Sequence, residues 1–425
     1  MESIKENDND EKQKLNKNEP NLIGRYKYKI KSKIRDRIYK GIKYNDPSKK
    51  EYILKKIEGI SDNLDCAKDT FRQISILTSI KHKKIIKLLD VYIPEPENLN
   101  FLYLVFDKKP YSLKSIIKSL KFDYIHEPAH KNFIKTIIYQ ILLALDYLHS
   151  LNIIHRDIKS SNILLGDNPS LLFVNDFDTA RKYSNNECQN QYIPFNVDDV
   201  SRQPLTQKKG TLYYAAPEVL GNNLIYNEKV DIWGVGCIMI ELYKRKCPFF
   251  GYDKNCGNEN LKEEWRGGEQ LLKIFSVFGR PEENIIKKVI LNEQLCKNII
   301  KIINQNDYPI KKFEEIFPEI EDKDAIDLLK KLMSFDPNER ISAKEALKHP
   351  FFDSIKNEKS EEGQKGNIEN KKNEKYNNDK ITNLYHEQYN DNTINNTSSD
   401  EEQIEFYKTK IMKCCENLKT QNNNK

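Results

Sequence analysis

The segment HRDIKSSN at residues 155–162 carries four side chains suited to the chemistry of phosphate groups. Asp157 can accept a proton from an incoming hydroxyl group, and Lys159 can neutralise a phosphate oxygen. Asn162 can hold a metal ion through its amide oxygen, and Arg156 can bind a negatively charged group elsewhere on the chain. The alternative is a surface loop with a chance cluster of charges. Further matching segments follow in order along the chain, which argues against that alternative.

The spacing from Asp157 to Asn162 resembles the catalytic loop of the protein kinases, and Lys159 is typical of their serine/threonine branch. Asp176, in the sequence NDFD, stands where this family has a second metal-binding aspartate. The resemblance implies a bilobal α+β fold: a small β-rich N-lobe with one helix, the αC helix of the family, and a larger α-helical C-lobe. It also implies transfer of the γ-phosphoryl group of ATP to protein hydroxyls, with Asp157 as the catalytic base. Asn162 and Asp176 would hold Mg²⁺.

Length and composition limit the fold and the partners. A chain of 425 residues exceeds what one compact core usually holds, which predicts two lobes or domains and tails. Lys and Arg exceed Asp and Glu by only 70 to 64, which does not argue for a nucleic-acid partner. The eight cysteines include no pair with zinc-binding spacing, so we expect free thiols and a cytoplasmic or nuclear location, or both. The longest apolar run, at 232–240, is too short for a membrane span and predicts a buried helix.

Residues 27–38 alternate between basic and other side chains, a period of two that predicts a strand with one basic face. By resemblance this stretch contains the glycine-rich loop over the ATP phosphates, with Ile30 and Ile38 against adenine. The three glycines of that loop are replaced by Lys31, Lys33 and Asp36. Glycine lets backbone amides approach phosphate closely. Either the basic side chains replace part of that attraction or, as we favour, a solvated strand face adjoins a weakened nucleotide site.

Lys55, in the sequence EYILKKI, falls where the family has the lysine that pairs the α- and β-phosphates of ATP. Ile53 adds bulk where the family usually has a small alanine against adenine. The next segment has apolar residues at helical spacing and resembles the αC helix, but Gln73 replaces the glutamate that pairs with the lysine. Gln73 can hydrogen-bond to Lys55 without neutralising it, and Asp69, one turn away, could serve instead. On this reasoning Gln73→Glu should tighten ATP binding or raise the transfer rate.

The apolar segment 101–109 predicts a strand that leads into a polar hinge between the lobes. By resemblance Phe106 is the gatekeeper of the nucleotide site, and the backbone of Asp107 and Lys109 binds adenine. Leu164, two residues beyond the catalytic loop, would close the adenine slot from below. Together with Lys55, these residues make up the expected ATP site.

The stretch from Asp176 to Glu218 resembles the activation segment of kinases, lengthened by a polar insertion. Asp178 replaces a glycine whose conformational freedom lets this segment change state. Thr206 stands where cyclin-dependent kinases carry their activating threonine, and we expect its phosphorylation to order the segment and raise activity. The arginines at the places that receive this phosphate are Arg72, Arg156 and Arg181.

Features of the C-lobe indicate the kinase group. The insert at 267–283 resembles the extra helices of the cyclin-dependent and MAP kinases, the CMGC group, to which the pattern is closest. Ala215 stands where that group has an arginine that selects a following proline, so proline-directed specificity is not implied. By resemblance Asp231 anchors the catalytic loop, and Arg340 pairs with Glu218.

The resemblance divides the chain into a tail at 1–24, the N-lobe at 25–108, the C-lobe at 109–355 and a second tail at 356–425. Both tails are polar, and the second is rich in Asn, Lys and Glu, so we expect disorder in most of their length. One helix is expected near 400–418, because a capping-box pattern precedes apolar residues at 3-4 spacing. Those residues are Ile404, Tyr407, Ile411, Cys414 and Leu418. Two heptads are too short to fold alone, so this helix should dock on the kinase body or on a partner.

Two functions remain open. The first is a serine/threonine kinase, similar to the cyclin-dependent kinases, that uses ATP and Mg²⁺ on a protein substrate. A cyclin-like or other activating subunit on the αC helix would be a further partner. The second is a pseudokinase that scaffolds or regulates a partner, which the lost glycines, Gln73 and Asp178 support. We favour the enzyme because Asp157 and Asn162 survive. We expect no membrane partner, and no nucleic acid, since no aromatic platform accompanies the basic strand.

Overall fold

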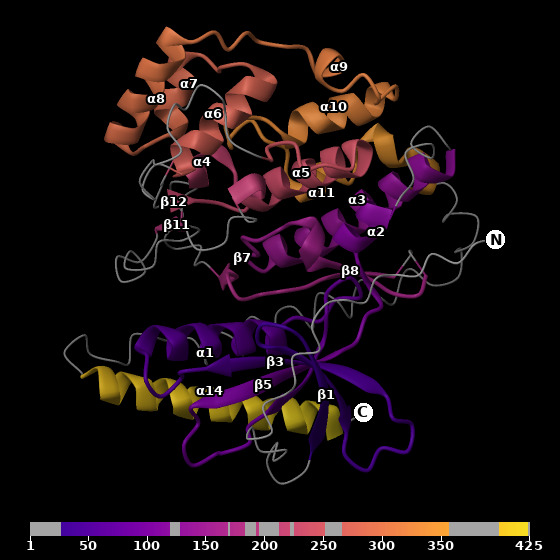
Figure 1. Cartoon of the computed structure of the whole chain (residues 1–425), viewed down its shortest axis with the longest axis vertical. Helices are drawn as coiled ribbons and strands as arrows, with labels where there is room; N and C mark the ends of the chain where they lie inside the picture. The colour runs from indigo at the N-terminus through magenta and orange to yellow at the C-terminus, as the bar shows by residue number, and fades with distance from the viewer. Residues whose placement is uncertain are drawn as a thin grey trace, which may run out of the picture.

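The computed structural model describes residues 27–119, 128–168, 171–182, 193–194, 212–221, 225–250, 266–356 and 399–423. Two lobes lie one above the other in Figure 1: a smaller one that contains a sheet, and a larger one that is mostly helical. The predicted bilobal α+β fold is confirmed. Among the described residues, no helix is both long enough and apolar enough to span a membrane.

The sheet of the smaller lobe has five strands in the order β1-β2-β3-β5-β4, and all neighbouring pairs are antiparallel. The strands are β1 (Tyr28–Arg35), β2 (Ile38–Lys43), β3 (Glu51–Glu58), β4 (Leu88–Tyr92) and β5 (Phe101–Asp107). The alternating stretch at 27–38 is therefore not a single strand. It turns at Asp36 and Arg37, where Arg37 has a φ of 56°, and returns as β2.

The two faces of this sheet have different roles. Successive side chains of a strand point to opposite faces, so Leu54 and Lys55 on β3 are separated in this way. Leu54 is buried in a cluster on one face, with Tyr28, Tyr92, Tyr103 and Val105. This packing fixes the register of β3 and directs Lys55 to the other face, toward the larger lobe.

Helix α1 (Leu64–Ser79) covers that other face, and the C-terminal helix α14 (Asp400–Asn423) lies beside it (Figure 1). Asn63 caps α1 by accepting a hydrogen bond from the backbone of Cys66 at 2.9 Å. The ring of Phe71 on α1 packs against that of Tyr407 at 5.8 Å, and the Ser75 hydroxyl lies 3.6 Å from the Cys414 sulfur. The end of the chain is thus folded back onto the smaller lobe.

The contacts of α14 follow its sequence pattern closely. Ser399 and Glu402 form the capping box, with hydrogen bonds of 3.2 and 3.3 Å between each side chain and the other's backbone amide. The buried side chains are Tyr407, Ile411, Cys414, Cys415 and Leu418. Ile404 is only half-buried, whereas Cys415, which the 3-4 spacing omits, is buried. The helix docks on the smaller lobe of the same chain, which is one of the two positions expected for it.

We expect Ile411→Ala to lower the free energy of unfolding by about 2–4 kcal/mol, because Ile411 is fully buried between α14 and the smaller lobe. Lys413→Ala is the matched control, since Lys413 lies on the exposed side of the same helix. Urea unfolding of the full chain measures both changes. Equal midpoints for the two variants would show that α14 does not dock as described.

The larger lobe is built around α3 (Pro128–Ser150) and α5 (Lys229–Lys244), which pack against each other. The apolar run at 232–240 forms the predicted buried helix as part of α5, and Trp233 stacks on Phe249 at 5.8 Å. The other helices are α2 (Leu113–Ser119), α4 (Pro217–Leu220), α6 (Arg266–Phe278), α7 (Glu283–Val289), α8 (Glu293–Gln305), α9 (Phe313–Ile316), α10 (Lys323–Leu332) and α11 (Ala343–Ala346). The 3-10 turns are η3 (Ser160–Asn162), η6 (Leu212–Tyr214) and η9 (Pro350–Phe352).

Short strands frame the segment HRDIKSSN at the junction of the lobes. They are β6 (Tyr111–Ser112), β7 (Ile153–Ile154), β8 (Ile163–Leu165), β9 (Leu172–Val174) and β10 (Arg181–Lys182). β11 (Ile193–Pro194) and β12 (Ile225–Tyr226) form a separate two-stranded sheet. β7 leads directly into the segment and β8 leaves it, while β9 runs antiparallel to β8. The strand pairs therefore hold residues 155–162 and Asp176 side by side.

Candidate active site

Asp231 of α5 holds the start of the catalytic loop. Its carboxylate accepts hydrogen bonds from the backbone amides of His155 and Arg156, at 2.9 and 2.8 Å, and lies 2.9 Å from His149 Nε2. Burial alone would raise the pKa of Asp231, but the hydrogen bond and charge of His149 outweigh it and lower the pKa. The ionised Asp231 thus stabilises the loop where Arg156 adopts a left-handed φ of 71°. This is the anchoring role expected from the sequence.

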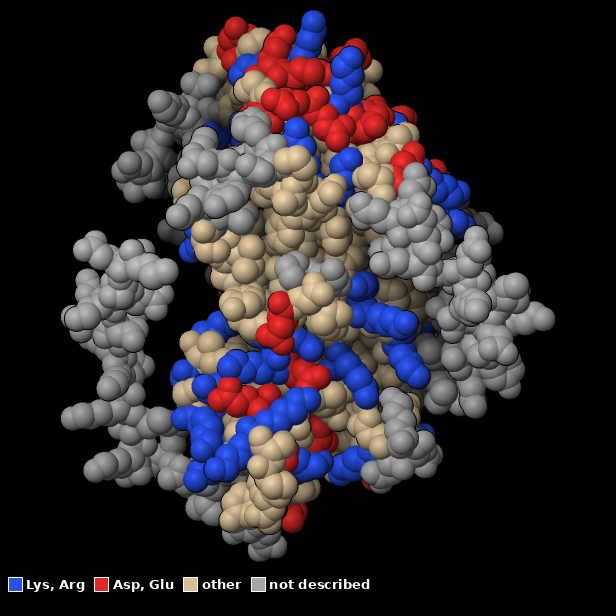
Figure 2. All heavy atoms as spheres, turned by 90° about the vertical axis from the view of Figure 1, so that its right-hand side faces the viewer, with Lys and Arg blue, Asp and Glu red and all other residues tan. Residues whose placement is uncertain are grey.

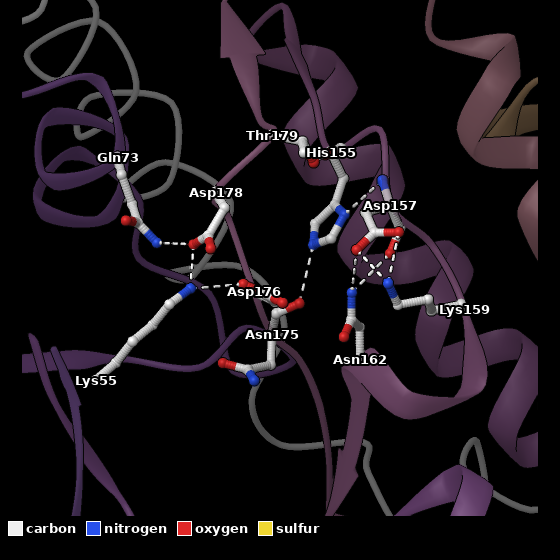
Figure 3. A network of polar contacts seen from close by, with 10 residues as sticks. All are labelled: Lys55, Gln73, His155, Asp157, Lys159, Asn162, Asn175, Asp176, Asp178 and Thr179. Carbon is white, nitrogen blue, oxygen red and sulfur yellow. Dashed lines mark hydrogen bonds and ion pairs between the residues drawn. The ribbon is translucent and has the colours of Figure 1, made fainter. Parts of the chain in front are cut away.

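Asp157 is the centre of a small network within the loop (Figure 3). Lys159 Nζ donates to both of its carboxylate oxygens, at 2.9 and 2.6 Å. Asn162 Nδ2 donates to the Asp157 backbone oxygen at 2.9 Å and to its Oδ2 at 2.8 Å. These bonds fix the Asp157 carboxylate, and they leave the Asn162 amide oxygen pointing away from it.

Asp176 lies across from this network and forms an ion pair with Lys55 of β3, at 2.8 Å. Phe177 is buried against His155, with ring centroids 4.9 Å apart, and His155 Nε2 lies 3.1 Å from the backbone oxygen of Asn175. Buried Phe177 turns the chain so that Asp176, with a φ of 72°, points into the site. The structure therefore brings together the five predicted catalytic and metal-binding residues: Lys55, Asp157, Lys159, Asn162 and Asp176.

The contacts of Lys55 with α1 differ from those expected. Asp178 Oδ1 accepts a hydrogen bond from Lys55 Nζ and another from Gln73 Nε2 (Figure 3). Asp69 is not the partner of Lys55: its carboxylate pairs with Arg72 and Arg181 instead. From the sequence alone, Asp178 is recognisable only as the replacement of a glycine. The available signal was that a carboxylate missing at 73 coincides with an extra one at 178.

The charges of Lys55, Asp176 and Asp178 influence one another's pKa. Burial by itself would raise the pKa of Asp176, but the charge and hydrogen bond of Lys55 outweigh it and hold that pKa well below its usual range. Burial and the charge of Asp176 both raise the pKa of Asp178, although 46% of its side chain is exposed, which weakens the effect. Burial lowers the pKa of Lys55, yet the two carboxylates raise it overall. Lys55 is therefore a cation, and Asp176 is the more strongly ionised carboxylate.

Comparison with known proteins decides the family. The protein kinase domain family matches residues 37–352. The chain belongs to this family. Extracellular signal-regulated kinase 2 of Dictyostelium discoideum is 34% identical over 339 residues, 79% of this chain and 82% of that protein. Mitogen-activated protein kinase 11 of Arabidopsis thaliana is 31% identical over 309 residues, or 72% and 73% of the two chains. The mitogen-activated protein kinase homologue NTF6 of Nicotiana tabacum is 32% identical over 312 residues, 73% of each chain.

These similarities confirm the predicted family and activity: the protein is a serine/threonine protein kinase of the CMGC group. The family uses ATP and a divalent metal ion. The relatives named above are MAP kinases. These similarities support the CMGC group as a whole and do not single out the cyclin-dependent kinases that the sequence led us to expect.

Only some of the residues predicted to contact adenine lie on the same face of the sheet as Lys55. Ile38 is opposite Lys55 in the β2–β3 register, and Ile53 is opposite the predicted gatekeeper Phe106 in the β3–β5 register, so both lie beside the kinase lysine. Ile30, in contrast, packs partly against the cluster around Leu54 on the opposite face. The structure does not bring Ile30 together with Lys55 as it does Ile38.

The remaining residues of the predicted adenine site lie around the hinge of the kinase. The Asp107 carboxylate pairs with Lys50 at 2.7 Å, and the Lys109 ammonium lies over the Phe173 ring at 4.2 Å. Leu164, on β8, is half-buried and packs against the main core. The side chains of Asp107 and Lys109 are thus engaged on the protein itself, which is compatible with recognition of adenine through their backbone.

The donor atoms of the site fit a divalent metal bound together with a nucleotide. Asp176 and Asn162 offer a carboxylate and an amide oxygen, the ligand type that hard cations prefer. No cluster of three or more His, Cys, Asp or Glu residues that could hold a metal occurs in the described part of the chain. The metal would therefore need further oxygen ligands from the phosphates of ATP, as expected for a kinase.

A cavity of about 30 Å³ adjoins Asp157. Its lining includes Arg156, Thr179, Ala215 and Tyr226. Thr179 also donates to the backbone oxygen of His155 at 3.1 Å, which ties the activation segment to the catalytic loop. Ala215 leaves this cavity without the arginine that the family's proline-directed members carry there.

The predicted regulatory arginines are partly assembled. Arg72 of α1 and Arg181 of β10 both bond to Asp69 Oδ1, the latter at 3.3 Å. The Arg156 guanidinium lies over the Tyr226 ring at 5.5 Å. The Asp69 carboxylate thus already draws the helix and the activation segment together.

Proposed function

We propose that this kinase transfers phosphate from magnesium-bound ATP to serine or threonine in a manner similar to the MAP kinases. The observation that carries the proposal is the joint placement of Asp157, Lys159, Asn162, Asp176 and Lys55 (Figure 3). Phosphoryl transfer requires mainly positioning and charge compensation, and this set offers both.

The proposed roles follow from the contacts. Asp157, held by Lys159 and Asn162, orients the substrate hydroxyl and accepts its proton. Lys159 and Lys55 compensate negative charge on the phosphates. Asp176 and Asn162 would hold the metal, which would supply positive charge to the phosphate oxygens.

Calorimetric titration with ATP tests whether the nucleotide site works. We expect the full chain to bind ATP in the presence of Mg²⁺ and to bind it more weakly when EDTA removes the metal, because Asp176 and Asn162 would lose their share of the contacts. A heat signal identical with and without Mg²⁺ would contradict the assigned metal ligands.

A pseudokinase is the second candidate, and the glycine-rich loop is the observation that favours it. Lys31 and Lys33 are exposed on β1, and the Lys33 ammonium lies 6.0 Å from the centre of the Tyr39 ring. From the side on which β1 lies, the smaller lobe carries many Lys and Arg side chains (Figure 2). This favours a solvated basic face over a close cradle for phosphate. A pseudokinase would transfer no phosphate and would act as a scaffold or allosteric regulator of a partner.

Phosphorylation of Thr206 remains our proposal for activation, and Thr206 lies outside the described residues. The support is that Arg72 and Arg181 already converge on one carboxylate, so a phosphate could replace Asp69 as their partner. We expect Thr206→Ala to lower activity by about 5- to 150-fold. Arg181→Ala should have the same effect, and the two changes together should add nothing further.

Mass spectrometry of the native protein gives the decisive check on that proposal. Active protein in which Thr206 is unmodified would contradict it, and Ser201, also outside the described residues, would then be the next candidate.

We also propose a cyclin-like activating subunit on α1. Such a subunit would have to displace α14 from the face of α1 that this helix covers. Co-purification of the full chain with and without residues 399–425 would show whether such a subunit competes with α14.

A further inference from the structure

Two departures from the kinase pattern meet at one atom. Asp178 Oδ1 accepts hydrogen bonds both from Lys55 Nζ and from Gln73 Nε2, which come from β3 and α1 (Figure 3). Gln73 is buried, with 5% of its surface exposed, and lies 105 positions from Asp178 in the sequence. The contact therefore links α1, β3 and the start of the activation segment.

The chemistry of the two residues is complementary only in this combination. The Gln73 amide is neutral and can donate to a carboxylate, whereas a glutamate at 73 would place a second negative charge against Asp178. A glycine at 178, as in the family, would leave Lys55 with no carboxylate apart from Asp176. Glutamine at 73 without aspartate at 178 would leave Lys55 one carboxylate short, and aspartate at 178 with glutamate at 73 would give it one too many. Together, the two replacements keep one carboxylate beside Lys55 in addition to Asp176.

The backbone tolerates the extra side chain. Asp176 has a left-handed φ of 72°, whereas Asp178 is not among the described residues with positive φ. A residue other than glycine at 178 is therefore free of the conformational cost that such a φ would carry. Since Asp176 is the expected metal ligand, Asp178 is the carboxylate left to orient Lys55.

We propose that Asp178 is a positioning residue that has taken over the role of the αC glutamate, with Gln73 as its anchor on α1. In this arrangement the carboxylate that orients Lys55 toward the phosphates comes from the activation segment, and α1 supplies a neutral donor. The proposal rests on the kinase activity of the chain. It reverses the expectation from sequence that Gln73→Glu would strengthen the site.

A cycle of four variants of the full chain tests this proposal: Asp178→Asn, Asp178→Gly, Gln73→Glu and the double variant Gln73→Glu/Asp178→Gly. For each, we would measure the ATP KM and kcat, the affinity for ADP by calorimetry without turnover, and the unfolding temperature without nucleotide. Asp62→Asn is the control, because Asp62 is an exposed carboxylate in the turn before α1.

We expect each single change at 73 or 178 to weaken ADP binding and kcat/KM by about 10- to 100-fold, the effect of losing a charged hydrogen bond. The double variant should recover to within about threefold of the wild type, a difference below 1 kcal/mol. Asp62→Asn should change nothing. A Gln73→Glu variant that binds ADP more tightly than the wild type would overturn the proposal. The proposal would also be overturned if the double variant had the wild-type unfolding temperature but an ADP affinity and a kcat/KM no higher than those of the single variants. A wild type that transfers no phosphate would refute the kinase activity instead, and the ADP affinities would still decide on Asp178.

Discussion

Asp157→Asn should lower kcat by about 10²- to 10⁴-fold, the usual contribution of a positioned general base. The asparagine keeps the size of the side chain and can still accept a hydrogen bond from Lys159 or Asn162, so the loop should retain its shape. What it loses is the carboxylate that accepts the proton of the substrate hydroxyl. Rates of phosphate incorporation into a generic protein substrate, at saturating ATP, measure the change.

Asp167→Asn serves as the control for that measurement. Asp167 is an exposed carboxylate in the loop after β8, and its replacement should leave kcat and the ADP affinity unchanged. Asp157→Asn should also bind ADP with the affinity of the wild type, since Asp157 acts on the substrate hydroxyl and not on the nucleotide. Equal residual activity in the wild type and Asp157→Asn would mean that Asp157 does not act as the base.

Glu218→Gln should reduce the free energy of unfolding by about 3–5 kcal/mol, because it leaves a buried arginine without its counter-charge. The Arg340 guanidinium binds both oxygens of Glu218, at 2.8 and 3.1 Å, and neither side chain is more than 3% exposed. Arg340 also donates to the backbone oxygens of Ser334 and Lys229, at 3.0 and 2.8 Å. It therefore joins the end of the activation segment to the start of α5 and to the segment that follows α10.

Glu293→Gln is the matched control for this effect, because Glu293 pairs with Lys297 on the surface, where both side chains are more than 70% exposed. That change should cost no more than about 0.5 kcal/mol. Urea unfolding followed by circular dichroism compares the two variants. Similar midpoints would indicate that the Arg340–Glu218 pair contributes no more than a surface pair.

The parts of the site that lie close together in sequence were predictable from it. The loop from Asp157 to Asn162 is a local structure, so its residue types and spacing determine most of its contacts. The partners Asp231 and Lys55 could be named only because the family places them there. Their distances to the loop depend on how α5 and β3 pack, which periodicity does not report.

The partner of Lys55 could not be predicted because it depends on a contact between distant segments. Position by position, Gln73 is a lost charge and Asp178 a lost glycine. Only the fold shows that their side chains share one atom with the lysine. Helical spacing made Asp69 a reasonable candidate, but its carboxylate forms ion pairs with Arg72 and Arg181 instead.

The C-terminal helix shows the same limit. The capping box and the apolar spacing predicted a helix that needs a surface to bind. Nothing in that pattern distinguishes α1 from a separate partner, because any apolar groove of suitable length would satisfy Tyr407 and Ile411. The choice is visible only in the contacts with Phe71 and Ser75.

We infer that this chain remains a catalyst although the loop over its phosphate site, at residues 31–36, has no glycines. The most direct measurement is transfer of the labelled γ-phosphate from ATP by the purified full chain with Mg²⁺, compared with Asp157→Asn prepared in the same way. We expect the wild type to incorporate labelled phosphate and Asp157→Asn to lose this activity. Binding of ATP by both proteins with no transfer by either would contradict this inference and identify a pseudokinase.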